Sequence, residues 1–326
     1  MPTAPYDFAA SAPSTFAPLS RRALMRHASH AAWALPLWGT LGGYSTLAGA
    51  QARNAKAVES WTQARWASGG TAGIGAAARA VKPFAATAVS SSCQLSCEAT
   101  IGPCHTQSPE RQDISDGWNG LPMLMQLRVV DAQCQPVAGA ILEVWHTNHT
   151  GGYSGDIHPM CNNNAQDKNR QFFRGWQRTD ELGVVHFDSC FPGWYGGRAN
   201  HVHLRVMKGS YDGRDRAPSW LVSQLLFPDA LNTSIFEQQP LYIAKGLPDT
   251  TLDTDNVIGN ESDKSPYLFD IQNVGGVMLA SKTLVIRSNL DDAVCQARGK
   301  RPSGPPPGSR GPGRGMRPPG EPPRQP

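Results

Sequence analysis

The chain has 326 residues, more than one core of ordinary size needs, which predicts one main domain with additional segments. Hydrophobic residues make up 40% and charged residues only 17%, an ordinary globular balance. The net charge of +4 does not indicate a nucleic-acid partner, because seven basic residues and one acidic residue lie between Arg298 and Arg324, which leaves a net charge of −2 for the remainder.

The first 52 residues predict an export signal of the twin-arginine type. Arg21 and Arg22 precede an uncharged stretch from Ala31 to Leu47, and small residues at 48–52 suit signal peptidase. The alternative is a single transmembrane anchor. Pro36 and three glycines interrupt the stretch, however, and it falls short of the ~20 strongly apolar residues that a span needs. We therefore expect cleavage, no stable membrane span afterwards, and a periplasmic or extracellular protein.

Three further segments follow the signal. Residues 53–92 are rich in Ala, Gly and Ser, and we interpret them as a flexible linker with little to bury. Residues 93–296 form the folded domain. From residue 297 to residue 326, Pro, Gly and Arg dominate, which predicts a disordered tail.

Seven cysteines are many for a cytosolic enzyme, and in an exported protein they predict disulfides. They are Cys93, Cys97, Cys104, Cys134, Cys161, Cys190 and Cys295. Because the number is odd, at least one stays free or pairs between chains. The spacing C-x3-C of the first two is not followed by a second pair at zinc-site spacing, which argues against a structural zinc.

Short β-capable runs separated by turn residues fill the folded domain. In chain order they are residues 123–130, 137–145, 184–187, 202–206, 221–227 and 283–286. This pattern predicts a mainly β fold, an antiparallel β-sandwich with irregular loops and few short helices. Neither G-x-G-x-x-G nor a Walker sequence is present, which weakens nucleotide-binding hypotheses.

Two polar clusters carry the candidate chemistry. His201 and His203 lie two residues apart in a predicted strand and therefore point to one face, as a pair of metal ligands would. Surface or hydrogen-bonded histidines are the alternative, and the spacing alone does not decide. Tyr195 lies just upstream in a Gly-rich turn. The second cluster, residues 143–154, contains Tyr153 and is, by composition alone, a polar loop after a strand.

Histidines in and near the second cluster are further candidate ligands. They are His146, His149 and His158.

These segments resemble the intradiol ring-cleavage dioxygenases, the family of protocatechuate 3,4-dioxygenase and catechol 1,2-dioxygenase. The resemblance runs from about Cys97 to the neighbourhood of Asn289. It is carried by Gly102-Pro103, residues 111–114, 137–140, 143–146, 173–177 and 192–195, Arg198-x-x-His201-x-His203, and residues 248–256.

The resemblance implies a ferric iron, Fe(3+), held by Tyr153, Tyr195, His201 and His203. It implies a small catecholic substrate, which O2 cleaves between the two hydroxyl-bearing carbons to give a muconate-type diacid. Tyr195 would also act as a base, Arg198 would stabilise the charged substrate, and Gln224 would lie beside it. Phenolate oxygen suits the hard ferric ion, which explains the two tyrosines.

The remaining histidines of the second cluster would then lie near the site without being ligands. His146 is placed as a structural residue at a strand end.

The chain also departs from the family. Cys104 and His105 follow Gly-Pro where many relatives have an aromatic residue, which predicts an altered pocket wall. Cys190 is expected to pair with Cys97, Cys104 or Cys134. The long helical dimerisation region of catechol 1,2-dioxygenases has no counterpart, and a homo-oligomer is left open.

Two other functions compete. The first is a non-enzymatic, transthyretin-like β-sandwich binding module, since residues 129–140 resemble such domains. The second is a copper or zinc hydrolase built on His146, His201 and His203. The tyrosine and histidine quartet discriminates among these hypotheses, because neither alternative needs both tyrosines.

Overall fold

The computed structural model describes residues 61, 63–84, 93–162 and 164–300. The predicted export signal, the outer parts of the predicted linker and most of the predicted tail lie outside the described residues. Within the described ranges, no helix is both long enough and apolar enough to cross a membrane.

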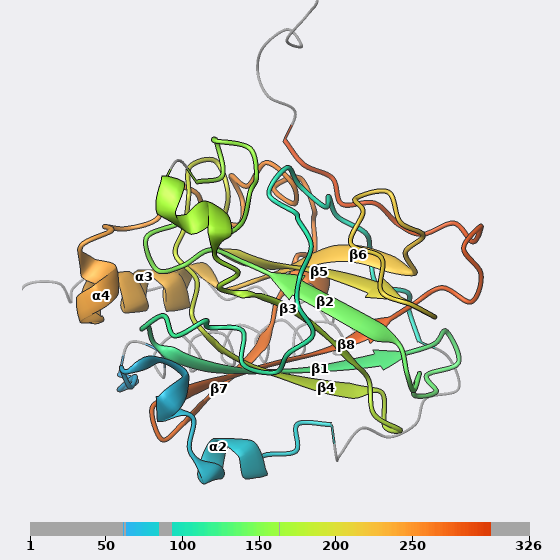
Figure 1. Ribbon diagram of the computed structural model, residues 1–326, viewed down its shortest axis with the longest axis horizontal. Helices are drawn as coiled ribbons and strands as arrows, with labels where there is room; N and C mark the ends of the chain where they lie inside the picture. Colours follow the sequence, from blue (N-terminus) through green and yellow to red (C-terminus); the bar gives the residue numbers. More distant parts are fainter. Residues whose placement is uncertain (1–60, 62, 85–92, 163, 301–326) are drawn as a thin grey trace, which may run out of the picture. The chain divides into compact units, whose positions relative to one another are not determined.

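Two four-stranded sheets pack face to face in the body of the domain (Figure 1). The first has the order β4-β1-β8-β7, with β4 Val184–Cys190, β1 Pro122–Val130, β8 Val277–Val285 and β7 Asp270–Val274. The second has the order β3-β2-β5-β6, with β3 Arg174–Arg178, β2 Ile141–Trp145, β5 His201–Met207 and β6 Leu221–Leu226. The predicted β-sandwich is confirmed. All pairs are antiparallel except β1 with β8, which run parallel.

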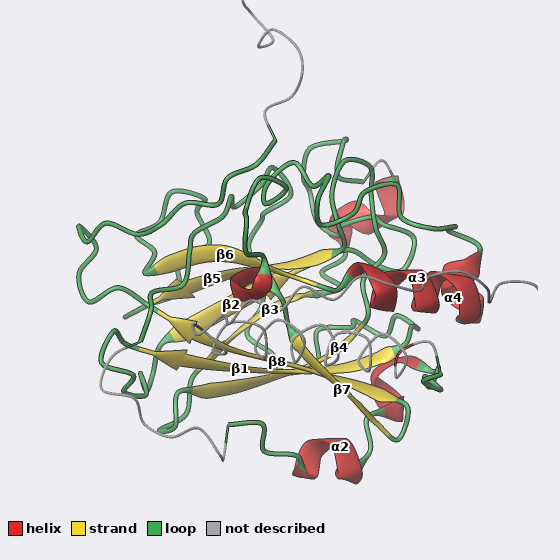
Figure 2. Ribbon diagram, turned by 180° about the vertical axis from the view of Figure 1, so that it is seen from behind, coloured by secondary structure: helices red, strands yellow, loops and turns green. Residues whose placement is uncertain are grey.

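The core lies between the sheets and follows from side-chain alternation along each strand. In β5, Val202, Leu204 and Val206 join the core cluster, together with Leu142 and Val144 of β2. The intervening residues of β5 point to the outer face of the second sheet, yet they are buried as well. That outer face is therefore covered by loops, which Figure 2 shows above β5 and β6.

The prediction of a flexible linker over residues 53–92 is wrong where the structure describes that segment. Trp66 is 7% exposed and joins the main core, while Ile74 and Ala78 pack on Leu124 of β1. Arg79 forms two hydrogen bonds, of 2.9 and 2.8 Å, with the carboxylate of Asp188 in β4. Sparse but well-placed apolar residues thus anchor a segment whose composition is typical of a linker.

This segment contains two short helices that sequence composition concealed. They are η1 Gly70–Gly73 and α2 Ala76–Ala80, the latter below the first sheet in Figure 1.

Other elements were absent from the predicted set. They are β3, β7, α3 Asp229–Gln238, α4 Pro240–Ile243, η2 Ala165–Asn169 and η3 Ser265–Tyr267. The strand β7 is largely exposed, so its sequence shows no clear apolar alternation. The boundary of the predicted tail also moves, because the backbone N–H of Ala297 donates to the carbonyl of Glu98 and that of Arg298 donates to Glu261.

Six of the seven cysteines form disulfides. The pairs are Cys93–Cys134, Cys97–Cys295 and Cys104–Cys161.

Cys190 is free and buried, so the expectation that it pairs with Cys97, Cys104 or Cys134 is wrong. All three have other partners, and Cys190 packs instead against Gly120 at the end of β4, where a Cβ on the glycine would lie 2.6 Å from the Cβ of Cys190. Burial raises the pKa of the Cys190 thiol to about 12, so the thiol is protonated at neutral pH. The odd cysteine is thus an inert part of the core.

The core position of Trp66 yields a prediction. Trp66→Ala should lower the free energy of unfolding by about 3–5 kcal/mol, because the substitution leaves a cavity in the core. Leu182→Ala is the control, since Leu182 is 66% exposed. Urea unfolding of both variants measures the difference, and equal small effects would show that residues 63–84 are not part of the domain.

Candidate metal centre

Two histidines define the centre of the candidate site. His201 and His203 both lie on the outer face of β5, 3% and 2% exposed, and their Nε2 atoms are 3.1 Å apart. Trp145, which is opposite His203 in the β2–β5 register, stacks on its ring with centroids 5.0 Å apart and an interplanar angle of 9°. The expected placement of both imidazoles on one face is therefore observed, and their nitrogens converge.

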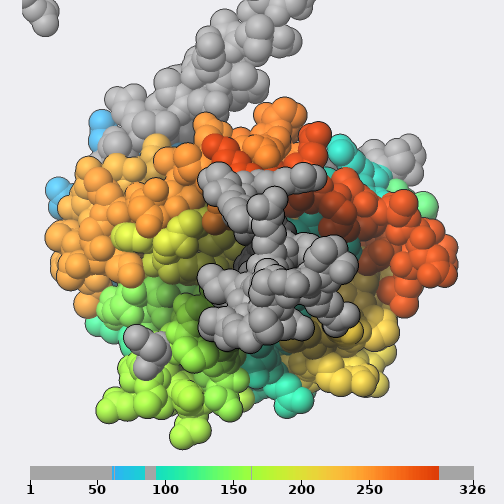
Figure 3. Space-filling view, turned by 90° about the horizontal axis from the view of Figure 1, so that it is seen from above, coloured from blue at the N-terminus to red at the C-terminus, as the bar shows by residue number. Residues whose placement is uncertain are grey.

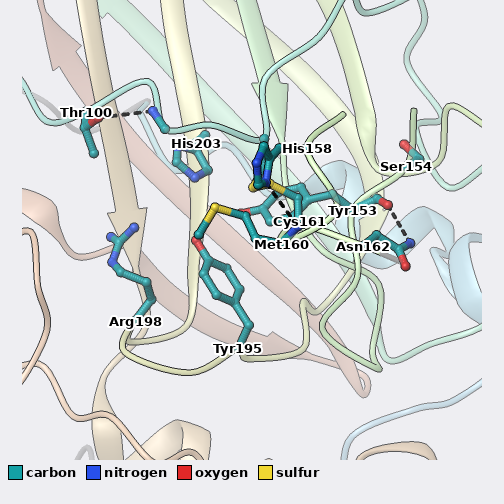
Figure 4. Close-up of a disulfide and its surroundings, with 12 residues drawn as sticks. Thr100, Tyr153, Ser154, His158, Met160, Cys161, Asn162, Tyr195, Arg198 and His203 are labelled. Carbon is teal, nitrogen blue, oxygen red and sulfur yellow. Dashed lines mark hydrogen bonds between the residues drawn. A yellow bond between two sulfur atoms is a disulfide. The ribbon is translucent and has the colours of Figure 1, made fainter. Parts of the chain in front are cut away.

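Tyr195 reaches this pair from the Gly-rich turn before β5. Its hydroxyl lies 3.2 Å from Nε2 of His201. The turn requires glycine at two places: a Cβ at Gly193 would lie 2.4 Å from the carbonyl oxygen of His149, and Gly197 has a φ of +78°. These glycines fold the turn back over the strand, and Figure 4 shows the side chains of Tyr195 and His203 directed toward the same space.

Tyr153 approaches from the loop after β2. Its ring centroid lies 5.8 Å from that of Tyr195 and 6.1 Å from that of His203. The residue is 1% exposed, and its hydroxyl has no hydrogen-bond partner among the described residues. Buried polar groups normally have partners, so an unpartnered phenol beside Tyr195 and the His203 imidazole indicates a site for a cation.

The protonation of these groups fits a metal site. Burial, reinforced by the positive charge of Arg198, holds the pKa of His201 well below its ordinary value, and burial together with His201 does the same for the pKa of His203. Both imidazoles are therefore neutral at neutral pH and offer lone pairs. Burial raises the pKa of Tyr153 and that of Tyr195, so both phenols need a strong cation to ionise.

This donor set fits ferric iron, because two phenol oxygens and two imidazole nitrogens combine hard, anionic donors with neutral ones. Among the described residues, no three His, Cys, Asp or Glu side chains gather into a metal site. A metal at this place would therefore depend on the two tyrosines.

A cationic residue borders the site. The guanidinium of Arg198 has its NH1 atom 3.5 Å from Nε2 of His201, and its NH2 group donates to Oε1 of Gln224. Gln224 is fully buried and donates from Nε2 to the carbonyl of Thr100 at 2.7 Å. Arg198 and Gln224 thus both lie beside the histidines, as expected, and Gln224 orients Arg198.

Asp255 was assigned no role from the sequence. Its carboxylate is fully buried and accepts hydrogen bonds from Nε of Arg198 at 3.0 Å and from the backbone N–H of Ala199 at 2.7 Å. It also accepts from the N–H groups of Val257 and Ile258 at 2.8 and 2.9 Å. The sequence signal available for Asp255 was its position in residues 248–256, a segment that carries the family resemblance. Only the fold brings this segment to Arg198.

The other candidate histidines have separate surroundings. His146 has Nδ1 2.8 Å from the carbonyl of Thr147 and Nε2 2.8 Å from the hydroxyl of Ser189, and burial lowers its pKa to about 4. Both nitrogens are engaged, so His146 is structural, as expected, and the hydrolase hypothesis loses a ligand. His149 contacts Trp118, and His158 is exposed.

The segment with Cys104 and His105 forms a wall of the site. Gly102 lies against His203, where a Cβ would be 3.1 Å from Cε1 of the imidazole. Cys104, through its disulfide, packs in one buried cluster with Trp145 and Tyr153. At this wall of the site the chain has a disulfide, packed against an aromatic cluster.

Chain segments far apart in sequence meet over this sheet. In Figure 3 the surface seen from above combines regions coloured teal, green, orange and red.

Comparisons with known proteins find dioxygenases. A family model described as "Dioxygenase" matches residues 100–229, a range that contains the two tyrosines and both histidines. The solved intradiol ring-cleavage dioxygenase from Tetranychus urticae is 27% identical and has a TM-score of 0.51, and the match covers 61% of this chain and 98% of that one. No curated protein matches the sequence.

Two further solved structures have lower scores. The dioxygenase domain of a dioxygenase carbohydrate-binding protein fusion from Streptomyces sp. SirexAA-E is 21% identical, with a TM-score of 0.40 and coverage of 60% of this chain and 100% of that one. The 3-chlorocatechol 1,2-dioxygenase from Rhodococcus opacus 1CP is 21% identical, with a TM-score of 0.41 and coverage of 59% and 72%.

Proposed function

We propose that this chain is an intradiol ring-cleavage dioxygenase and that it uses one ferric ion held by Tyr153, Tyr195, His201 and His203. It would cleave a catechol-type ring between the two hydroxyl-bearing carbons with O2, giving a muconate-type diacid. The observation that carries the proposal is that Nε2 of His201 lies 3.2 Å from the Tyr195 hydroxyl and 3.1 Å from Nε2 of His203, beside a buried phenol without a partner among the described residues.

Bound ferric iron would supply Lewis acidity toward the phenols and the catechol hydroxyls, together with redox activity toward the ring and O2. The residues of the chain set the conditions for this chemistry. Because the imidazoles of His201 and His203 are neutral, the positive charge of a bound ferric ion would be offset by the anionic donors, Tyr153 and Tyr195. Tyr153, His201 and His203 are buried and Tyr195 is partly buried, which limits the access of water and strengthens electrostatic interactions in the site.

The two tyrosines are placed for different roles. Tyr153 is enclosed by the disulfide, Trp145 and the loop, whereas Tyr195 is only partly buried and lies on a turn. Tyr195 is therefore the phenol that can move aside for the substrate and accept a proton from a catechol hydroxyl. Tyr153 would remain a fixed ligand.

Arg198 is positioned to stabilise negative charge on the substrate. Its guanidinium lies beside His201 and is held by Asp255 and Gln224 on its other sides. A catechol that gives up both protons carries two negative charges, and a fixed cation next to the ring stabilises that form. The partners implied are thus a small catecholic molecule and O2.

The proposal predicts that the purified protein contains one iron per chain and is burgundy, because tyrosinate bound to ferric iron absorbs visible light. Oxygen uptake measured with catechol, protocatechuate, hydroxyquinol and chlorocatechols should identify the preferred ring. A colourless, iron-free protein that stays inactive after ferric loading would overturn the proposal.

The ligand roles are tested by two variants. Tyr195→Phe should keep iron but shift the colour and slow turnover, since three donors remain and the base is lost. His203→Ala should lose iron, because a fixed nitrogen donor disappears from the strand. Metal analysis and single-turnover kinetics distinguish these results, and equal iron content and activity in both variants would contradict the assignment.

Asp255 should act through Arg198. Asp255→Asn removes the charge that fixes the guanidinium, and we expect kcat to fall about 10-fold to 100-fold while iron content stays the same. Asp253→Asn is the matched control, because its carboxylate is 85% exposed and pairs with Lys264. Unchanged kcat in Asp255→Asn would show that Arg198 does not depend on this carboxylate.

A further inference from the structure

The loop that follows Tyr153 has few hydrophobic anchors. Between Ser154 and Asp167, Cys161 is the only buried residue that the structure describes, and Ile157 is partly buried against the same cluster. The neighbouring Met160 is 74% exposed. Packing therefore gives this loop few attachments, and the disulfide of Cys161 is the only covalent crosslink among its described residues.

This attachment also fixes the backbone of Tyr153. The N–H of Tyr153 donates to the carbonyl of Cys161 at 3.2 Å, and the carbonyl of Tyr153 accepts from Nδ2 of Asn162 at 2.7 Å. Asn162 Nδ2 also donates to Asp167 at 2.6 Å. Figure 4 shows the Asn162 contact beside the disulfide. Since the phenol itself has no partner, its position is set through the backbone. Cys161 and Asn162 hold Tyr153 itself, and the hydroxyl of the adjacent Ser154 donates to the carbonyl of Phe172 at 2.7 Å.

The other half of the disulfide is on a rigid segment. Cys104 follows Gly102, which lies against His203, and precedes His105. The His105 ring has Nδ1 2.6 Å from Asp215, and its Nε2 is 3.3 Å from both carboxylate oxygens of Glu143. Glu143 is fully buried and accepts two hydrogen bonds from the Arg205 guanidinium, at 3.1 and 2.8 Å. Cys104 is thus attached to the sheet that carries the histidines.

We propose that the Cys104–Cys161 disulfide is a positioning crosslink that holds Tyr153 against the histidine pair and thereby slows the release of the metal. The inference rests on the proposed function, because it takes Tyr153 as a ligand. Release requires Tyr153 to move away from His201 and His203. The crosslink resists this movement because it ties the tyrosine loop to the segment packed on His203.

The test compares two double variants of the full-length protein, Cys104→Ala/Cys161→Ala and the control Cys93→Ala/Cys134→Ala. The control disulfide closes a loop of similar length, with a sequence separation of 41 against 57, so both variants lose similar chain constraint. The control disulfide lies near the turn that precedes β2, and Trp145 is at the other end of that strand. Reductants are avoided because they also reduce ferric iron.

Each protein is loaded with ferric iron and mixed with excess EDTA, and bound iron and the tyrosinate absorption band are followed over time. We expect the Cys104→Ala/Cys161→Ala protein to release iron about 10-fold to 100-fold faster than the wild type, with a shifted band. The control should match the wild type in both readouts. Equal release from all three proteins would overturn the crosslink role, whereas a wild type that never binds iron would overturn the proposed function itself.

A second variant covers the case in which the doubly substituted protein shows no cooperative unfolding. Asn162→Ala removes the other tie to Tyr153 and leaves the disulfide intact, so it should also accelerate iron release. Asn164→Ala, on the exposed part of the same loop, should not. Iron release from Asn162→Ala at the wild-type rate would then contradict the proposal.

Discussion

Strand β5 buries side chains on both of its faces, and the rest of the site depends on this. One face supplies Val202, Leu204 and Val206 to the core between the sheets, and the other presents His201, His203 and Arg205. Polar groups can be buried only with partners, so the outer face has to be covered by loops that bring such partners. The tyrosines and Asp255 reach β5 in this way, whereas Gln224 lies opposite His203 in the neighbouring strand β6.

Arg205 of β5 and Glu143 of β2 lie two residues away from His203 and Trp145 along their strands. They show the same constraint, that buried polar groups need partners. Both side chains are fully buried, and the carboxylate also accepts hydrogen bonds from Ser108 at 2.7 Å and Tyr211 at 2.9 Å. Such an ion pair requires nearly complete hydrogen bonding to offset the loss of solvent. This network fixes the segment around His105. The buried ion pair therefore also holds the wall of the candidate site in place.

Much of the architecture could be predicted from sequence, because short β-capable runs between turn residues mark β1, β5 and β6, and the H-x-H spacing places two imidazoles on one face. The choice of ligands among several histidines came from family resemblance, and the structure agrees in engaging both nitrogens of His146 elsewhere. Disulfide partners could not be predicted, since pairing depends on distances that only the fold sets. The anchoring of Trp66 was hidden by the small residues around it, and Asp255 acts on a residue 57 positions away.

The parallel pairing of β1 with β8 has a consequence for how this chain reaches its native state. Met123 pairs with Met278, so a central strand of the first sheet waits for a partner 155 residues further along the chain. Until that partner is available, one edge of β1 has unpaired backbone groups, and contacts so distant in sequence close slowly. The first sheet therefore cannot be completed before β8 has been made.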